Sequence, residues 1–174
     1  MTRVKFIAED GAEIAETAMV LPLLFMIIFA IFWFGRAFFI YSTITRAANA
    51  GAHAAALPGC ATCAAGITPG QNAYNQIQTS LAAAHMDIAA AQPPVTTPNL
   101  LNCQTSQPVA CDASPTNICV QENVNILPHG TVGGSGSICG VAVSFAYPFP
   151  FRLPFTSLGN IVIPAGAQVR MEAQ

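Results

Sequence analysis

An uncharged apolar stretch occupies residues 17–35 and constrains every account of how this chain folds. As a helix, its 19 residues would be about 28 Å long, close to the roughly 30 Å hydrocarbon core of a bilayer. A helix buried in a soluble core is the weaker alternative, because consecutive aliphatic and aromatic side chains leave no polar face. A secretory signal peptide has an apolar region of only about 7–15 residues and then a cleavage site, whereas this stretch passes into Arg36 and further helical sequence. We therefore predict a retained transmembrane segment at residues 17–35.

The helical pattern extends well beyond the apolar stretch. It runs from Ala12 to Leu57, and the alanine-rich residues 47–56 have high helix propensity. Pro22 is the residue expected to kink it. A helix over residues 12–57 would be about 69 Å long, roughly twice the hydrocarbon thickness, so its second half must lie outside the membrane.

Composition limits what the rest of the chain can be. The chain has 174 residues, of which 53% are hydrophobic and 8% are charged, and its net charge is −2. This fits one anchor and one modest domain, residues 58–174, after a short N-terminal leader, residues 1–11. No cluster of lysine and arginine is present, so nucleic acid is not an expected partner.

All of the cysteines follow the apolar stretch: Cys60, Cys63, Cys103, Cys111, Cys119 and Cys139. An even number on one side of a membrane segment indicates an oxidising compartment and up to three disulfides, whose pairing the sequence leaves open. We therefore expect a single-pass membrane protein with residues 58–174 outside the cytoplasm. A zinc site would need a second close pair of cysteines besides Cys60 and Cys63, so neither a metal nor a cofactor is expected.

The elements expected in the domain are one helix and several strands. Thr68 and Pro69 have the pattern of a helix start, and apolar residues recur at helical spacing up to Pro93. A loop region, residues 93–115, follows. Strands are expected at 118–126, at 141–147, where Pro148, Pro150 and Pro154 should interrupt the pattern, and at the end of the chain near 167–172. The predicted fold class is α+β, with the long helix packed on a small antiparallel sheet.

Several stretches of this sequence, including the expected strands at 141–148 and 167–172, carry a resemblance to a known family. The Gly-Ala-Glu-Ile-Ala-Glu segment at residues 11–16 resembles the processing site of type IV prepilins, with a glycine before the cut and a glutamate as the fifth residue after it. With residues 16–24, 34–38 and 49–55, it is similar to the TadE-like pseudopilins of tight-adherence (Tad/Flp) pili. The resemblance implies a pilin-like fold and cleavage between Gly11 and Ala12 by a membrane prepilin peptidase.

The resemblance also implies roles for two residues of the apolar helix. A carboxylate at the hydrocarbon edge is costly unless it is paired, and in pilins the glutamate at the position of Glu16 pairs with the free amino terminus of an adjacent subunit. An interfacial carboxylate that faces headgroups is the alternative. Glu13, three residues earlier on the same helix face, could compete with Glu16 for this role. Pro22 removes one backbone hydrogen bond and would allow local melting when subunits pack, although a merely tolerated proline explains it equally well.

The function expected from these features is structural. We predict a pseudopilin or minor pilin subunit that packs through its N-terminal helix with other pilin-like subunits, either homo- or hetero-oligomeric, in a surface filament. The alternatives are an unprocessed membrane-tethered assembly factor and an anchored exported domain whose residues 60–140 bind a ligand. No enzyme is predicted, because the histidines are isolated and Ser135 lacks the strand-to-helix setting of a nucleophile elbow.

Overall fold

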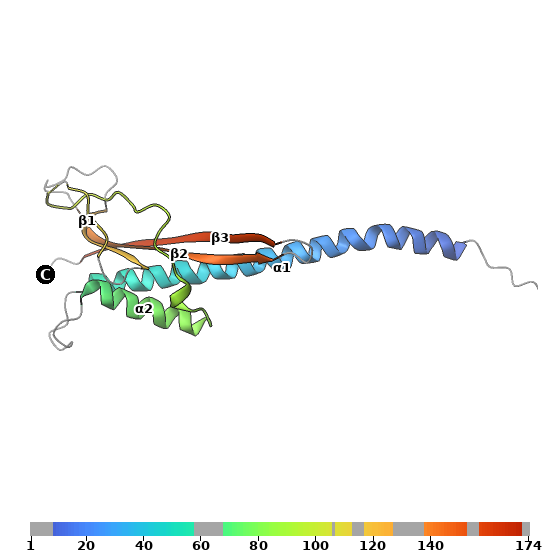
Figure 1. Cartoon of the computed structure of the whole chain (residues 1–174), viewed down its shortest axis with the longest axis horizontal. Coiled ribbons are helices and arrows are strands. Elements are labelled where there is room, and N and C mark those ends of the chain that lie inside the picture. The colour runs from blue at the N-terminus through green and yellow to red at the C-terminus, as the bar shows by residue number, and fades with distance from the viewer. Residues whose placement is uncertain are drawn as a thin grey trace, which may run out of the picture. The chain divides into compact units, whose positions relative to one another are not determined.

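The computed structural model describes residues 9–57, 68–105, 107–112, 117–126, 138–152 and 157–171. Across these residues the elements follow in the order α1, α2, η1, β1, β2 and β3 (Figure 1). The chain divides into two compact units, Met1–Phe39 and Ile40–Gln174, and helix α1 contributes to both. The fold is α+β with a small antiparallel sheet and disulfide bonds, which confirms the predicted fold class.

Helix α1 spans Glu9–Ala56, and Pro22 lies inside it. It therefore begins slightly before the predicted Ala12 and ends just before the predicted Leu57. The end is explained by the sequence that follows, because Leu57 precedes Pro58, and a residue before proline is disfavoured in the helical region. Continuity through Pro22 follows from the long apolar run on either side, since one missing hydrogen bond bends a helix more readily than it ends a strongly helical stretch.

Within the Ile40–Gln174 unit, α1 buries a single stripe of apolar and small side chains. Its members recur three and four residues apart, which places them on one helix face. They are Ile40, Ile44, Ala47, Ala48, Gly51, Ala52 and Ala55. Small residues allow a neighbouring element to approach closely, and Ile77 of helix α2, Pro69–Ala83, occupies the space beside Gly51.

Both ends of α2 are capped by side chain or backbone groups. Thr68 is the N-cap, and its hydroxyl accepts a hydrogen bond from the N–H of Gln71 at 3.2 Å, which confirms the predicted start. The predicted continuation towards Pro93 is wrong, because the helix ends at Ala83. There His85 has φ 56°, and the N–H groups of His85 and Met86 donate to the carbonyls of Ala82 and Leu81, the paired bonds of a Schellman motif. A short 3-10 helix, η1 (Ile88–Ala90), follows.

The sheet contains β1 (Cys119–Asn125), β2 (Cys139–Arg152) and β3 (Ser157–Arg170), paired antiparallel in the order β1-β2-β3. The predicted strands are thus all present, although β2 and β3 extend further than predicted. Both faces of β2 are buried from Val141 to Ala146. The register between β1 and β2 shifts between Gln121 and Val124, where Asn123 has φ 53°.

Pro148 and Pro150 do not interrupt β2, and the prediction that they would is wrong. Ala146 exchanges both of its backbone hydrogen bonds, at 2.8 Å each, with Gln92 on the β1 side of the strand, so it makes none with β3. Backbone direction repeats every second residue, so the nitrogens of Pro148 and Pro150 also point away from β3. No strand of the described chain pairs with β2 on that side beyond Ala146. The prolines therefore stand where no N–H is required.

The outer edge of β1 is covered by a segment that we name the strap, residues 92–105 and 107–112. Three backbone hydrogen bonds attach it to β1: Cys103 N–H to the Asn123 carbonyl at 2.7 Å, Asn125 N–H to the Leu101 carbonyl at 2.8 Å, and Asp112 N–H to the Val120 carbonyl at 2.8 Å. Disulfides Cys103–Cys139 and Cys111–Cys119 join the strap to β2 and β1. The strap thereby removes an exposed sheet edge.

Candidate functional site

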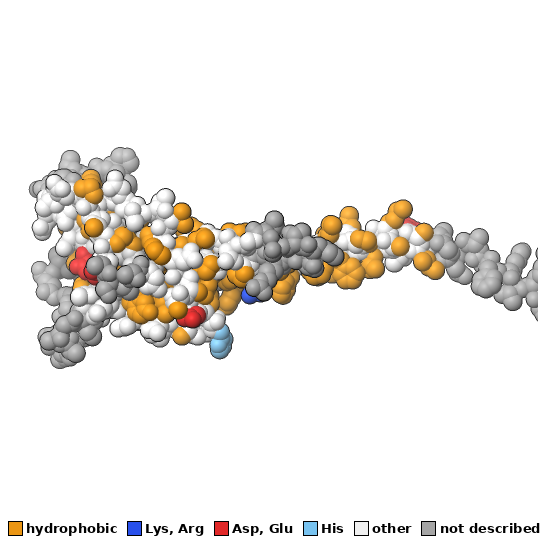
Figure 2. All heavy atoms as spheres, viewed as in Figure 1, with side chains coloured by type: hydrophobic (Ala, Val, Ile, Leu, Met, Phe, Trp, Pro, Cys, Tyr) orange, Lys and Arg blue, Asp and Glu red, His pale blue; other side chains and the backbone are white. Residues whose placement is uncertain are grey.

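The first candidate site is the surface of α1 over residues 14–39. Nearly every side chain there is exposed, for example Met19 at 83% and Phe34 at 75%. Hydrophobic side chains cover this part of the helix in Figure 2. Such a surface is unstable in water, because each large apolar side chain left exposed forgoes about 1.5–3 kcal/mol of burial. A surrounding bilayer or other helices must therefore cover it.

Length and composition make α1 a candidate membrane anchor. It is the one helix in the described part of the chain long and apolar enough to cross a bilayer. Within the described residues, none of the apolar window of this helix is buried.

Glu16 and Arg36 bracket the apolar surface. They are the only charged residues between positions 14 and 39, and both are exposed. Twenty residues separate them, which is about 30 Å along a helix axis, the thickness of a hydrocarbon core. A helix placed upright would therefore hold both charges at the two interfaces. The sequence analysis singled out Glu16 but not this pairing with Arg36, which residue counting alone would have revealed.

The predicted processing site lies at the beginning of α1. Gly11 and Ala12 both belong to the helix, so the bond between them lies in its first turns. Residues 1–8 of the predicted leader lie outside the described residues. Glycine weakens a helix by about 1 kcal/mol relative to alanine, and helix ends fray, so this bond is among the easiest in α1 to unwind. Cleavage there stays a prediction.

Four of the six cysteines form the disulfides already described, and Cys60 and Cys63 lie outside the described residues. Within the described ranges, no group of three histidine, cysteine or acidic side chains is placed to hold a metal ion. His53 is exposed near the end of α1, and His85 serves as the left-handed residue after α2. Ser135 and His129 lie outside the described residues.

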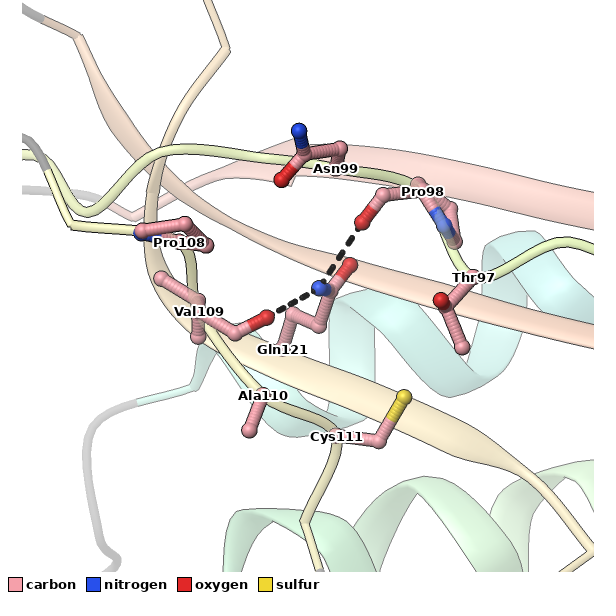
Figure 3. Close-up of a pocket in the computed structure, with 8 residues that line it drawn as sticks. All are labelled: Thr97, Pro98, Asn99, Pro108, Val109, Ala110, Cys111 and Gln121. Carbon is pink, nitrogen blue, oxygen red and sulfur yellow. Dashed lines mark hydrogen bonds between the residues drawn. The ribbon is translucent and has the colours of Figure 1, made fainter.

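A pocket of about 430 Å³ lies between the strap and β1 (Figure 3). Gln121 of β1 lines it and is only 2% exposed. Its Nε2 donates hydrogen bonds to the carbonyls of Pro98, at 3.0 Å, and Val109, so one amide holds both arms of the strap. No side chain that lines the pocket is charged. The sequence analysis missed Gln121, although a glutamine inside an otherwise apolar strand was the available signal.

Glu122 and Asp112 place two carboxyl groups near this end of the sheet. Partial burial raises the pKa of Glu122 above its ordinary value, and the negative charge of Asp112 raises it further. The pair has no histidine or metal-ligand partner in the described structure that would make it a catalytic or binding centre. Its effect is on stability, through the cost of ionising Glu122 in the folded state.

One comparison with known protein families gives a match, and the matched residues lie within helix α1. Residues 11–53 match the model of the family described as TadE-like protein. No curated protein and no solved structure matches the chain. The matched stretch covers 43 of the 174 residues, lies entirely within α1, and contains Gly11, Ala12, Glu16 and Pro22. The resemblance seen in the sequence is thereby confirmed, and over residues 11–53 the chain is similar to the TadE-like family.

Proposed function

We propose that this protein is a pseudopilin or minor pilin subunit of a Tad/Flp-type pilus, anchored in the bacterial inner membrane before assembly. The observation that carries the proposal is the coincidence of two features on one helix. The TadE-like match covers residues 11–53, and residues 14–39 of the same helix form an apolar surface whose only charged residues are Glu16 and Arg36. A filament of such helices would cover that surface after the helix leaves the bilayer.

Glu16 supplies the specific contact in this account. It is the only acidic residue between positions 14 and 39, so moving the helix into an apolar bundle requires a cationic partner for it. A prepilin peptidase that cuts between Gly11 and Ala12 would create such a partner, because the new α-amino group carries a positive charge near neutral pH. The amino terminus of one subunit would then pair with Glu16 of its neighbour and set their register.

Pro22 adds a place where the helix can yield. Its missing N–H leaves one turn of α1 with a hydrogen bond fewer, within the apolar surface itself. Helices that pack around a common axis must adjust their curvature, and a turn already lacking a bond adjusts at the lowest cost. Replacing Pro22 by alanine should stiffen this turn without changing the apolar surface.

The test compares two acidic residues three positions apart. Glu16→Ala should abolish incorporation into filaments while the exported domain keeps disulfides Cys103–Cys139 and Cys111–Cys119, measured by peptide mapping of the membrane-bound chain. Glu13→Ala, the matched control, removes the same charge near the same end and should retain incorporation. If the two variants assembled equally well, the proposed role of Glu16 would be wrong.

A further inference from the structure

The two described disulfides are nested rather than consecutive along the chain. Cys111 pairs with Cys119, and this pair lies between the partners of the other, Cys103 and Cys139. A domain that is exported in the order of its sequence, from residue 58 onward, presents these cysteines in the order 103, 111, 119 and 139. Pairing each cysteine with the next one to emerge would therefore give 103–111 and 119–139, and neither of these is native.

The entropy of loop closure does not favour the native disulfides over the consecutive ones. Cys103 and Cys111 are eight residues apart, the same separation as the native pair Cys111–Cys119. Because the entropy of closing a loop depends on its length, the pairs 103–111 and 111–119 cost the same loop-closure entropy in the unfolded chain. Cys111 meets Cys103 first simply because Cys119 has yet to emerge. The competing pair 119–139 also closes a shorter loop than the native pair Cys103–Cys139, which spans 36 residues.

In the folded chain, the sheet places Cys103 beside its native partner. Cys103 reaches Cys139 across the end of β1, where the strap pairs with β1 through the bond from Cys103 N–H to Asn123. Asn125 in turn lies opposite Cys139 in the β1–β2 register. The native bond thus joins the first and the last of the four described cysteines to be exported.

We propose that this protein is a substrate of an extracytoplasmic thiol–disulfide isomerase, which converts consecutive disulfides into the nested native pair. Oxidation of each cysteine pair passes two electrons and two protons to the disulfide of an oxidase, which is thereby reduced to a dithiol. The rearrangement that follows is redox-neutral: an isomerase thiolate attacks the 103–111 bond, a mixed disulfide forms, and the freed cysteine thiolate attacks the next disulfide until the isomerase leaves reduced. The inference goes beyond the proposed function and requires only export of the domain.

The experiment expresses the full-length chain in a bacterial host with and without its periplasmic disulfide isomerase, and maps the disulfides by mass spectrometry. The full-length chain has six cysteines, which allow 15 connectivities, so random pairing of all six gives about one fifteenth native product. We expect predominantly native pairing with the isomerase. Without it we expect native pairing to become the minority product, with bonds 103–111 and 119–139 in the remainder. Quantitative native pairing without the isomerase would overturn the proposal.

The matched control is the double variant Cys111→Ser/Cys119→Ser. It leaves Cys103 and Cys139 as successive cysteines, so their bond should form equally well in both hosts. A domain that folds less stably does not obscure the result, because the readout is the bond itself. If the double variant depended on the isomerase as strongly as the natural chain, nesting would not be the cause and the proposal would be wrong.

Discussion

A Cβ atom on residue 51 would lie 2.6 Å from Cγ1 of Ile77, so glycine at this position is what allows α2 to pack against α1. The carbonyl oxygen of Ala73 would lie 3.3 Å from the same Cβ, which limits the escape of the helix backbone. Alanine gains about 1 kcal/mol of helix propensity over glycine, whereas overpacking costs about 1–3 kcal/mol. Gly51→Ala should therefore lower stability by about 1 kcal/mol net.

Near-ultraviolet circular dichroism during thermal unfolding of the full chain in detergent measures this effect. Gly35→Ala is the matched control, since a Cβ at Gly35 has no atom within 4 Å, and it should leave the midpoint unchanged or raise it. Equal midpoints for both variants would show that α2 can move away from α1 at little cost.

His85 is in a conformation that favours glycine. Its φ of 56° follows the last turn of α2, where an L-residue in the left-handed region costs about 1–2 kcal/mol. Replacing His85 by glycine removes this cost, but glycine also has greater conformational freedom in the unfolded chain, which offsets part of the gain. His85→Gly should therefore stabilise the domain by about 1 kcal/mol. Ala83→Gly, two residues earlier but inside the helix, should destabilise it by about the same amount. Calorimetric midpoints that fell for both variants would contradict the Schellman geometry.

Ionisation of Glu122 makes stability depend on pH. Burial, and secondly the charge of Asp112, raises the pKa of Glu122 in the folded state above its ordinary value of 4.5. The folded state therefore binds this proton more tightly than the unfolded state. The resulting stabilisation is complete below the unfolded pKa and is lost as pH rises through the folded pKa.

Glu122→Gln removes that titration. The variant should unfold at a higher temperature than the natural chain at about pH 7, and the difference should shrink towards about pH 4, where both side chains are neutral. Asp112→Asn should raise the midpoint less, because it removes only the secondary cause. A Glu122→Gln midpoint at or below the natural one at neutral pH would show that ionisation of Glu122 costs the fold nothing.

The two disulfides should contribute unequally to stability. In the chain-entropy description, closing a loop of 36 residues stabilises the fold by about 4 kcal/mol and closing a loop of 8 by about 2.5 kcal/mol. Cys103→Ser/Cys139→Ser should therefore lower the unfolding midpoint in urea more than Cys111→Ser/Cys119→Ser does. The reverse order would indicate that the shorter bond, which attaches the strap directly to β1, matters through the folded state instead.

Sequence reasoning succeeded where a pattern is local. Residues 17–35, the N-cap at Thr68 and the alternation from Val141 to Tyr147 each specify an element through propensity or periodicity. It failed for Pro148 and Pro150, because the fate of a strand proline depends on whether a neighbouring strand needs its N–H. That depends on where β1 begins, because Cys119, its first residue, pairs with Ser144 and no earlier residue of β1 reaches the prolines.

The candidate site divides in the same way. Glu16 and Pro22 were identifiable from the sequence of the helix alone. The position of Arg36, twenty residues after Glu16, could be found in the same way. The disulfide pairing was not, because Cys111 is equally distant in sequence from Cys103 and Cys119, and only the contact of the strap with β1 distinguishes them. Gln121 was missed for a similar reason, since its acceptors are carbonyls of the strap.

The central claim is that the TadE-like helix begins, in the mature protein, at a new amino terminus one turn before Glu16. The most direct measurement is the intact mass and N-terminal sequence of the protein isolated from its native membrane, beside a Gly11→Ala variant. The account predicts a natural chain that starts at Ala12 and a variant that still starts at Met1. A natural chain that starts at Met1, or one that starts beyond Gly35, would contradict it.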